Sequence, residues 1–393
     1  MEVLYRTHDY LLRNMQETIR RGLMDKIDSK DQIIGILGSR GIGKTTFLLD
    51  YAKEVYGTHN RKCLYVNLNQ FLFTTESLVN FAGRFVENGG RVLLLDQIYK
   101  YPNWKKELVQ AAEIHPELKI IYAGSSVQKD SSEEEEDTLP GVVYRLDGFS
   151  LREFINLRTG LSLPTIPYTD LLRFHKDFSR TVLESVNPVN FFADYIHHGY
   201  YPFFLEQRNY SENLLKNINM MLEVDIMYIR NIDQRLLPKL RKLLYMLARS
   251  APATPNVSQL AASIETSRAT VANYMHILSD AGLITQLYRA NEDESKKPAM
   301  CYLQNTNISY ALMPEPASPM DALTTFFLNQ VSALHHVDAG SRAQVNFVVN
   351  GEHLFRIDKE ISGRYKSDRF YAVGGINSGE RNILPLWSFG FLY

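Results

Sequence analysis

Cysteine is scarce in this sequence, which has only two in 393 residues, Cys63 and Cys301. Both lie in apolar surroundings, and neither has histidine or cysteine neighbours at a metal-ligand spacing. This excludes a disulfide framework and a cysteine-based metal site. We predict two buried thiols in a reducing compartment.

Long apolar runs are also missing. No stretch approaches the roughly 18 residues that a membrane-spanning helix needs, and the opening residues MEVLYRTHDYLLRNMQ contain no signal-peptide core. We therefore predict a cytoplasmic protein without a membrane segment. The net charge of -1 gives no overall attraction towards nucleic acid or anionic membrane, and it leaves a local basic face open.

What is present describes a globular chain of several domains. Apolar residues make up 45% and charged residues 22%, and the length is too great for one core, so two or three domains are expected. Residues 1–30 predict an amphipathic helix that packs on the first domain. Its basic residues Arg13, Arg20 and Arg21 are predicted on a solvated face, from which one could approach a ligand.

Residues 33–51 contain a motif that predicts phosphate binding. The mostly apolar residues 33–37 predict a buried parallel strand, GSRGIGKT at 38–45 fits GxxxxGKS/T, and 46–51 has the apolar spacing of a helix. This is a P-loop, whose backbone N–H groups and helix dipole hold a β-phosphate. We predict that Lys44 contacts the β- and γ-phosphates of ATP and that Thr45 ligates Mg²⁺. The predicted nucleotide-binding residues are Gly38, Gly41, Ile42, Gly43, Lys44, Thr45 and Thr46.

A second segment, residues 91–97, supplies an acid. Four apolar residues precede Asp96, as in a Walker B strand, which would bring the carboxylate to the Mg²⁺ opposite Thr45. ATPases of this type commonly place glutamate next, where this sequence has Gln97. Because glutamine can orient a water but cannot accept its proton, we predict slow hydrolysis. In the alternative, Asp96 or a nearby acid compensates for Gln97.

A third segment, residues 118–126, predicts a parallel strand that ends in Gly124-Ser-Ser. Ser125 or Ser126 is a candidate sensor of the γ-phosphate, and a plain turn is the alternative. The predicted catalytic group is Lys44, Asp96, Gln97 and Ser125. The acidic run SSEEEED at 131–137 is predicted to be a solvated surface loop, with a basic partner as the alternative.

These segments carry a resemblance. GSRGIGKTT, VLLLDQIYKYPNW, KIIYAGSS and FSLREF resemble the bacterial and archaeal AAA+-type ATPases with a C-terminal domain of unknown function, over essentially the whole chain. The family's Asp-Glu pair corresponds to Asp96 and Gln97. Where the family has an arginine, this chain has Val142, which leaves Arg145 and Arg152 as the nearest substitutes for an arginine finger.

The second half begins with a mainly helical pattern from 151 to 228. His197 and His198 have no further metal-ligand partners at a useful spacing, so we predict packing or surface histidines. Residues 238–287 predict helix, capped helix, turn, capped helix and strand, with Val257-Ser258 and Ser267 as the caps. This is the winged-helix order.

In a winged helix that binds DNA, the helix at 268–280 would enter the major groove. Its predicted exposed face contains Arg268, Thr270, Asn273, His276 and Asp280. This face therefore contains few basic residues for contacts with DNA phosphates. A winged helix used for protein contacts or as a lid is the alternative to DNA binding.

The end of the chain predicts a helix at 326–335 and strands at 345–349, 353–357 and 369–373. In the family this region resembles a restriction-endonuclease fold with acidic metal ligands. Here Gln344 and Asn346 replace the two acids of the first strand, and residues 357–360 do not match the family's acidic motif in the second strand. Because divalent metals need carboxylate oxygens, we predict a recognition or structural module rather than a nuclease.

Together these patterns predict an α/β P-loop NTPase parallel-sheet domain at 1–160, a helical region at 161–235, a winged helix at 236–295 and a small α+β domain at 296–393. The predicted function is an ATP-binding protein that uses its nucleotide state as a conformational switch, with weak hydrolysis and with ATP and Mg²⁺ as cofactors. An ATP-regulated DNA-binding protein is one alternative. The other is an interaction scaffold with a structural nucleotide and a protein partner or homo-oligomer.

Overall fold

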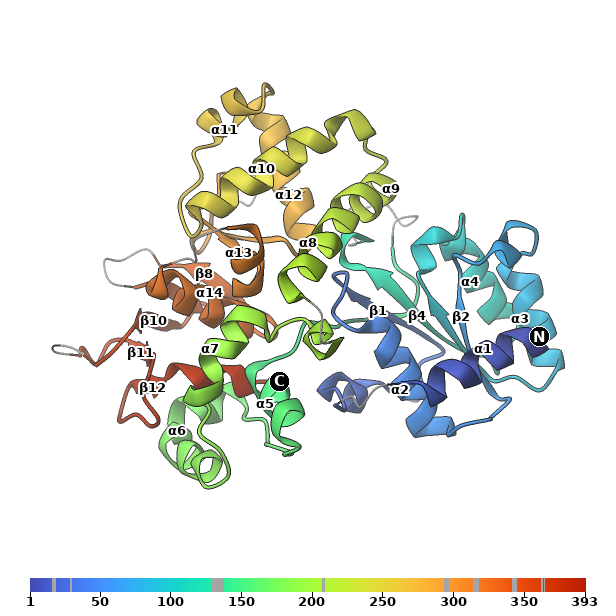
Figure 1. Ribbon diagram of the computed structural model, residues 1–393, viewed down its shortest axis with the longest axis horizontal. Coiled ribbons are helices and arrows are strands. Elements are labelled where there is room, and N and C mark those ends of the chain that lie inside the picture. The colour runs from blue at the N-terminus through green and yellow to red at the C-terminus, as the bar shows by residue number, and fades with distance from the viewer. Residues whose placement is uncertain are drawn as a thin grey trace. The chain divides into compact units, whose positions relative to one another are not determined.

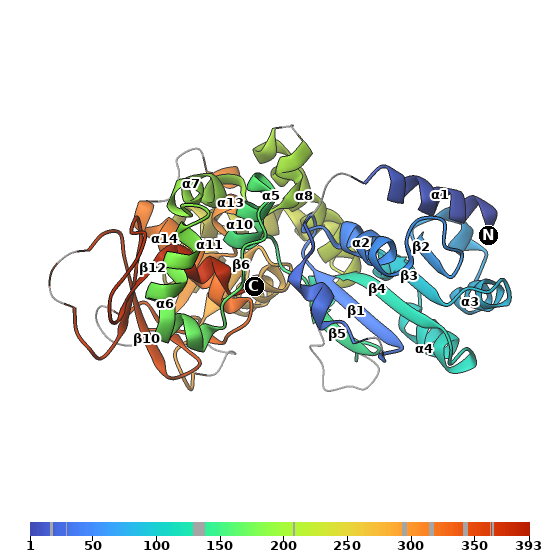
Figure 2. The same cartoon turned by 90° about the horizontal axis from the view of Figure 1, so that it is seen from below.

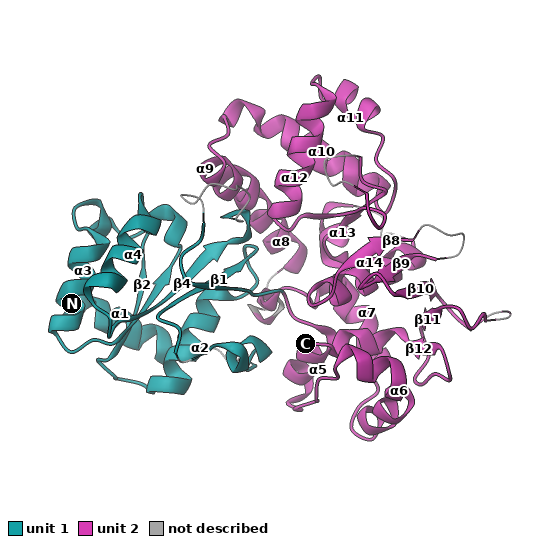
Figure 3. Ribbon diagram, turned by 180° about the vertical axis from the view of Figure 1, so that it is seen from behind, with its two compact units in different colours: residues 1–147 teal, residues 148–393 magenta. Residues whose placement is uncertain are grey.

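The structure is a computed structural model that forms two compact units, Met1–Asp147 and Gly148–Tyr393 (Figure 3). It describes residues 1–15, 19–28, 30–128, 138–206, 209–292, 297–313, 318–340, 345–361, 363 and 365–393. The acidic run at 131–137 and Gln344 lie outside the described residues. Each unit is considered by itself.

The first unit is built on a parallel sheet of five strands: β1 (Ile33–Gly38), β2 (Cys63–Asn67), β3 (Val92–Asp96), β4 (Lys119–Ser125) and β5 (Val142–Arg145) (Figure 1). Their order is β2-β3-β4-β1-β5, so β4 lies between the P-loop strand and the strand that ends in Asp96. Strand β5 was not predicted, because its residues are largely exposed and give no core pattern.

Helices cover both faces of this sheet. They are α2 (Lys44–Tyr56), α3 (Leu78–Glu87) and α4 (Trp104–Ile114), with the short 3₁₀ turns η2 (Phe71–Thr74), η3 (Ile98–Lys100) and η4 (Ser126–Gln128). Parallel crossovers are right-handed. The connection from β1 to β2 crosses the sheet in one direction, and the connections from β2 to β3 and from β3 to β4 run in the opposite direction. Right-handed connections therefore place α2 on one face of the sheet and α4 on the other (Figure 2).

The N-terminal segment protects the edge of the sheet. A shorter helix than predicted, α1 (Glu2–Arg13), packs against the edge strand β2, and η1 (Gly22–Lys26) follows it. His8 is 1% exposed, and its Nδ1 accepts a hydrogen bond of 3.1 Å from the N–H of Tyr65. Burial lowers the pKa of His8, which favours the neutral ring that this acceptor role requires. The helix thus satisfies a backbone donor that an edge strand would otherwise present to solvent.

The second unit begins with helices α5 (Leu151–Thr159), α6 (Tyr168–Leu183), α7 (Val189–His198) and α8 (Tyr210–Met220), followed by a π-helical turn η7 (Met221–Ile226) and α9 (Met227–Ile229). The short 3₁₀ turns η6 (Pro202–Glu206) and η8 (Gln234–Leu236) also belong to this region. The sequence predicts a domain boundary at 160, whereas the second unit of the structure begins at Gly148 and includes α5. Ser150 caps α5 and donates to the carbonyl of Tyr393, 2.9 Å away.

A buried amide of α13 (Thr306–Leu312) joins this helix to α7, to α8 and to the turn that follows α7. The side chain of Asn307 donates to the carbonyls of Tyr195 and Ile196, at 3.1 and 2.9 Å. Its oxygen accepts from the N–H of Tyr200 at 2.8 Å and from the hydroxyl of Tyr210 at 2.6 Å. All four hydrogen-bonding positions of the amide are therefore used.

The two adjacent histidines of α7 pack among aromatic rings. The His197 ring lies 4.3 Å from that of Tyr310, and the His198 ring lies 5.9 Å from that of Tyr210. These contacts fit the packing role that we predicted for both residues.

Three helices and a hairpin come next: α10 (Leu237–Ser250), α11 (Val257–Ser263), α12 (Arg268–Asp280), β6 (Ile284–Leu287) and β7 (Met300–Leu303), with β6 and β7 antiparallel. Ser267 caps α12, as predicted. The cap of α11 is Asn256, whose side chain accepts from the N–H of Gln259, rather than Val257-Ser258.

The chain ends in a five-stranded mixed sheet. Its strands are β8 (Val337–Ala339), β9 (Phe347–Val349), β10 (His353–Asp358), β11 (Phe370–Val373) and β12 (Ile383–Pro385), in the order β12-β11-β10-β9-β8. Helices α13 (Thr306–Leu312) and α14 (Pro319–Ser332) and the turn η9 (Leu386–Phe391) accompany it. The Phe327 ring of α14 lies 5.2 Å from Phe347 and 4.7 Å from Phe389, which places the core between α14, the sheet and η9. The side chain of Asn346 accepts from the N–H of Ile357, so this amide joins β9 to β10.

Both cysteines are buried free thiols, as predicted. Burial raises the pKa of each to about 12, which makes both poor nucleophiles. Within the described ranges, no helix combines the length and the apolar character that crossing a membrane requires.

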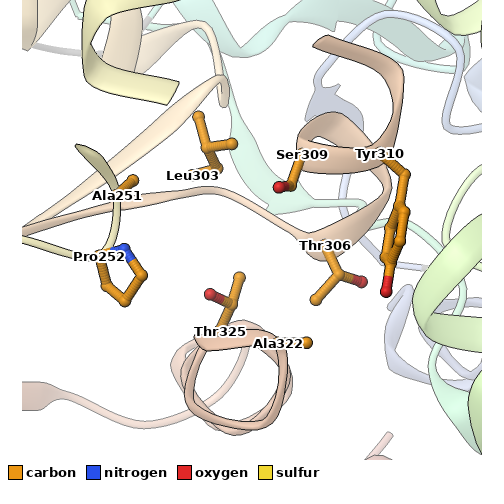
Figure 4. Close-up of a pocket in the computed structure, with 8 residues that line it drawn as sticks. All are labelled: Ala251, Pro252, Leu303, Thr306, Ser309, Tyr310, Ala322 and Thr325. Carbon is orange, nitrogen blue, oxygen red and sulfur yellow. The ribbon is translucent and has the colours of Figure 1, made fainter. Parts of the chain in front are cut away.

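A small cavity lies between the end of α10, α13 and α14 (Figure 4). Its lining includes Thr306, Ser309, Tyr310 and Thr325, and its volume is about 10 Å³. That is room for one water molecule at most, so this cavity is not a ligand site.

Candidate functional site

The P-loop connects β1 to α2 in the first unit. Gly41 and Gly43 have φ angles of 85° and 95°, in the left-handed region that glycine adopts without strain. A Cβ at Gly38 would collide with the side chain of Ile42 and the carbonyl of Leu146. The loop therefore has the tight turn that its glycine spacing predicted.

The side chains of the first turn of α2 point back to the loop and across to β3. The ammonium of Lys44 donates to the carbonyls of Gly38 and Ser39, both at 2.7 Å. The hydroxyl of Thr45 donates to Oδ2 of Asp96 over 2.6 Å. Thr46 follows in the same turn. The structure thus brings the predicted phosphate and metal residues together at the carboxyl edge of the sheet.

Asp96 is 4% exposed and accepts three hydrogen bonds. Besides Thr45, the hydroxyl of Tyr65 donates to Oδ2 at 2.8 Å, and the N–H of Gln97 donates to Oδ1 at 2.8 Å. Tyr65 belongs to none of the predicted motifs. A tyrosine inside the otherwise apolar strand CLYVN was the available signal, because a buried phenol needs a hydrogen-bond partner.

Gln97 stands at the turn after Asp96 in a left-handed conformation, with φ 54° and ψ 41°. This region is sparsely populated for residues other than glycine, and such residues gather at functional sites. The side chain is half-buried, and it has no hydrogen bond to any residue in the described part of the chain.

Ser125 and Ser126 differ in what they contact. The hydroxyl of Ser125 accepts from the N–H of Val127 at 3.3 Å, inside its own turn. The hydroxyl of Ser126 lies 3.5 Å from that of Ser39 in the P-loop and is half-buried. The geometry therefore places Ser126 beside the loop, although we named Ser125 in the catalytic group.

The arginines are distributed differently from the prediction. Arg145 pairs with Asp147 at 2.8 Å, and Arg152 donates to the carbonyl of Tyr393 within the second unit. Arg21 is 7% exposed and donates to the carbonyls of Ile42 and Asp147, at 3.4 and 2.6 Å. The solvated face predicted for Arg21 is therefore wrong, because those carbonyls lie in the P-loop and at the end of the first unit.

The residues at this edge fit Mg-ATP. Mg²⁺ in proteins is typically held by one or two carboxylates together with substrate phosphates and water. Asp96, the Thr45 hydroxyl and the loop before α2 supply that donor set. Across the residues that the structure describes, no group of three or more His, Cys, Asp or Glu side chains could hold a metal without such a substrate.

The helix proposed to contact DNA, α12, lies in the second unit. Arg268 and Asn273 are exposed, whereas Thr270 interacts with the cap residue Ser267. Asp280 forms an ion pair of 2.7 Å with Arg230, so its charge is compensated. A groove of about 360 Å³ runs beside α12.

Comparisons with known proteins bear on both halves of the chain. Residues 30–155 match the family model of an AAA domain, and residues 190–303 match a domain of unknown function, DUF8612. The uncharacterized protein MJ1637 of Methanocaldococcus jannaschii is 25% identical over 291 residues. That match covers 68% of this chain and 60% of MJ1637, so it spans less than two thirds of the relative.

Two solved structures are also similar. PCH-2 of C. elegans is 13% identical, with 71% of this chain and 66% of that chain covered and a TM-score of 0.25. The closed state of Hsp104 with ATPγS and casein is 14% identical, with 70% and 53% covered and a TM-score of 0.33. The strand order of the sheet and the AAA-domain match support the fold. Residues 30–155 thus match an AAA domain, and the first unit has the parallel α/β fold of the P-loop NTPases.

Proposed function

We propose that the protein binds Mg-ATP at the P-loop and uses its nucleotide state as a conformational switch, with slow intrinsic hydrolysis. The observation that carries this proposal is the 2.6 Å hydrogen bond between Thr45 and Asp96. It joins the first turn after the P-loop to the end of β3, as a shared Mg²⁺ site requires.

Each residue has a role in this proposal. Backbone N–H groups of the loop and the start of α2 hold the β-phosphate, and Lys44 exchanges the loop carbonyls for phosphate oxygens. Thr45 and Asp96 hold Mg²⁺ and its water shell. Bound Mg²⁺ neutralises the charge that develops on the phosphates. Gln97 orients water without removing its proton, which accounts for slow hydrolysis.

The switch would act through the end of β4. Ser126 lies beside Ser39 of the loop, and β4 is the neighbour of both β1 and β3. A hydroxyl at this place donates to a γ-phosphate, which ATP has and ADP lacks. A state-dependent contact of this kind is the differential interaction that any ligand-driven switch needs.

Hydrogen exchange tests the switch. We expect peptides that cover residues 119–128 to exchange more slowly with Mg-ATP than with Mg-ADP, because only ATP engages Ser126. The Lys44→Ala variant should show no difference between the two nucleotides. Equal exchange in wild-type protein with both nucleotides bound would contradict the switch and would favour a scaffold with a structural nucleotide.

DNA binding is a second candidate, favoured by the groove beside α12. Helices α10 to α12 and the β6–β7 hairpin follow the winged-helix order. The groove lining includes Arg268, His276 and Lys297, and no acid occurs among the described residues that line it. With Asp280 paired to Arg230, this face is more basic than the sequence indicated.

A substitution at Arg268 tests DNA binding. If Arg268 contacts a phosphate, Arg268→Ala should weaken duplex binding and lower the slope of log affinity against log salt by about 1. Arg173→Ala, which removes an exposed arginine of α6, is the matched control. Fluorescence anisotropy at several salt concentrations measures both. Binding that is absent, independent of salt, or equally reduced by the control change would rule this candidate out.

A further inference from the structure

The buried hydroxyl of Tyr65 lies at the proposed magnesium site but belongs to none of the predicted nucleotide-binding motifs. Tyr65 lies on β2, is 6% exposed, and donates to Asp96 Oδ2 over 2.8 Å. The phenol is the donor in this hydrogen bond, because an ionised carboxylate can only accept.

The hydroxyl completes a closed set of donors around the carboxylate. Thr45 and Tyr65 both donate to Oδ2, and the N–H of Gln97 donates to Oδ1. Rotation of the carboxylate would disturb all three hydrogen bonds. Of the three donors, Thr45 is also a predicted metal ligand, and Gln97 sits in a left-handed turn. Tyr65 is the donor that a regular strand holds in place.

That strand is fixed from both sides. In the register of the sheet, Asn67 lies beside Asp96, and the N–H of Leu68 donates to the carbonyl of Asp96 at 3.0 Å. On the outer side, the N–H of Tyr65 donates to His8 of α1. The backbone at Tyr65 is thus anchored to β3 and to the N-terminal helix.

We propose that Tyr65 is a positioning residue of the Mg²⁺ site, which orients Asp96 towards the metal's water shell. This inference rests on the proposed function. The Thr45 hydroxyl could offer a lone pair to Mg²⁺ while it still donates to Oδ2, and the second donor on that oxygen, Tyr65, would hold the carboxylate in its orientation. Hydrogen bonds that orient metal-binding carboxylates typically change metal affinity by about 10- to 100-fold when removed.

The test compares ADP binding by calorimetry with excess Mg²⁺ and with EDTA. For Tyr65→Phe, we expect unchanged ADP affinity in EDTA and an enhancement by Mg²⁺ that is about tenfold smaller than in wild type. Tyr122→Phe is the matched control, because its buried hydroxyl donates to the carbonyl of Pro140 in the same unit. It should leave both affinities unchanged.

Failure of this inference and failure of the proposed function give different results. If wild-type protein binds no nucleotide, or binds it without help from Mg²⁺, the proposed function fails. If wild type shows the enhancement and Tyr65→Phe keeps it in full, the positioning role is overturned.

A double-mutant cycle separates positioning from a general loss of structure. In an Asp96→Asn background, Tyr65→Phe should have no further effect on the Mg²⁺ enhancement, because the group through which it acts is gone. An additional loss of the same size in that background would show that Tyr65 acts on the fold and not through Asp96. Thermal melting of each variant accompanies the titrations.

Discussion

Replacement of Lys44 by alanine is expected to abolish ATP and ADP binding at the concentrations used in calorimetry. The ammonium is the cation of the P-loop that is predicted to contact the β- and γ-phosphates, and hydrogen bonds to charged groups are each worth about 1.5 to 3 kcal/mol. Loss of two such bonds to phosphate oxygens lowers affinity by roughly 100-fold or more. The structure already shows the reach of this side chain, which spans two carbonyls of the loop.

The matched control is Lys53→Ala, which removes an exposed lysine from the last turn of the same helix. It should leave nucleotide affinity unchanged. Thermal melting of both variants separates a loss of binding from a loss of folding. Unchanged ATP affinity in folded Lys44→Ala protein would be incompatible with a nucleotide site at this loop.

The second large effect is expected from Gln97→Glu, which should raise ATP turnover by roughly tenfold or more. Positioned general-base catalysis typically contributes about 10² to 10⁴-fold, and the wild-type site lacks a base at this position. Asp96 is a poor substitute, because its carboxylate accepts hydrogen bonds from Thr45, Tyr65 and the N–H of Gln97.

Only part of that factor should return. Arg145 is paired with Asp147, and Arg152 donates to the carbonyl of Tyr393, so both arginines considered as fingers have other partners. The glutamate keeps the length of the glutamine, and we expect it to keep the left-handed backbone that Gln97 has at this position.

Steady-state phosphate release at saturating Mg-ATP measures this effect, with Lys44→Ala as the blank. Gln70→Glu adds the same charge elsewhere in the first unit and should not change the rate. A wild-type rate well above the blank that Gln97→Glu does not alter would mean that another residue is the base. If both proteins bind ATP and stay at the blank, the site holds nucleotide without turning it over.

The parts of the site that sequence could predict are those encoded within a few residues. Gly41, Gly43 and Lys44 lie within four residues of one another and define a loop, and Asp96 directly follows a run of four apolar residues. A strand and the turn that follows it are determined largely by neighbouring residues in the sequence. Their composition therefore predicted the parallel sheet, which the structure confirms, and the candidate site at its carboxyl edge, which stays a prediction.

The parts that were missed depend on contacts between distant segments. Tyr65 reaches Asp96 across 31 positions of the chain, and Arg21 reaches Asp147 across 126. Nothing in the local pattern around Arg21 distinguishes it from Arg20, which forms surface ion pairs with Asp25 and Glu54. Helix α5 was assigned to the wrong side of a boundary for the same reason, since its partners Gln330 and Tyr393 lie far along the chain.

The placement of α1 along β2 has a consequence for how copies of this protein meet. The edge of a parallel sheet can recruit a strand from another molecule, and this recruitment is the first step of ordered aggregation. At Tyr65, the outward N–H is occupied by His8, and the Tyr5 hydroxyl takes the carbonyl of Arg61 at the start of the same edge. The N-terminal helix therefore blocks the addition of a further strand at β2. We expect copies of a chain that lacked this helix to associate through β2 while the P-loop remained intact.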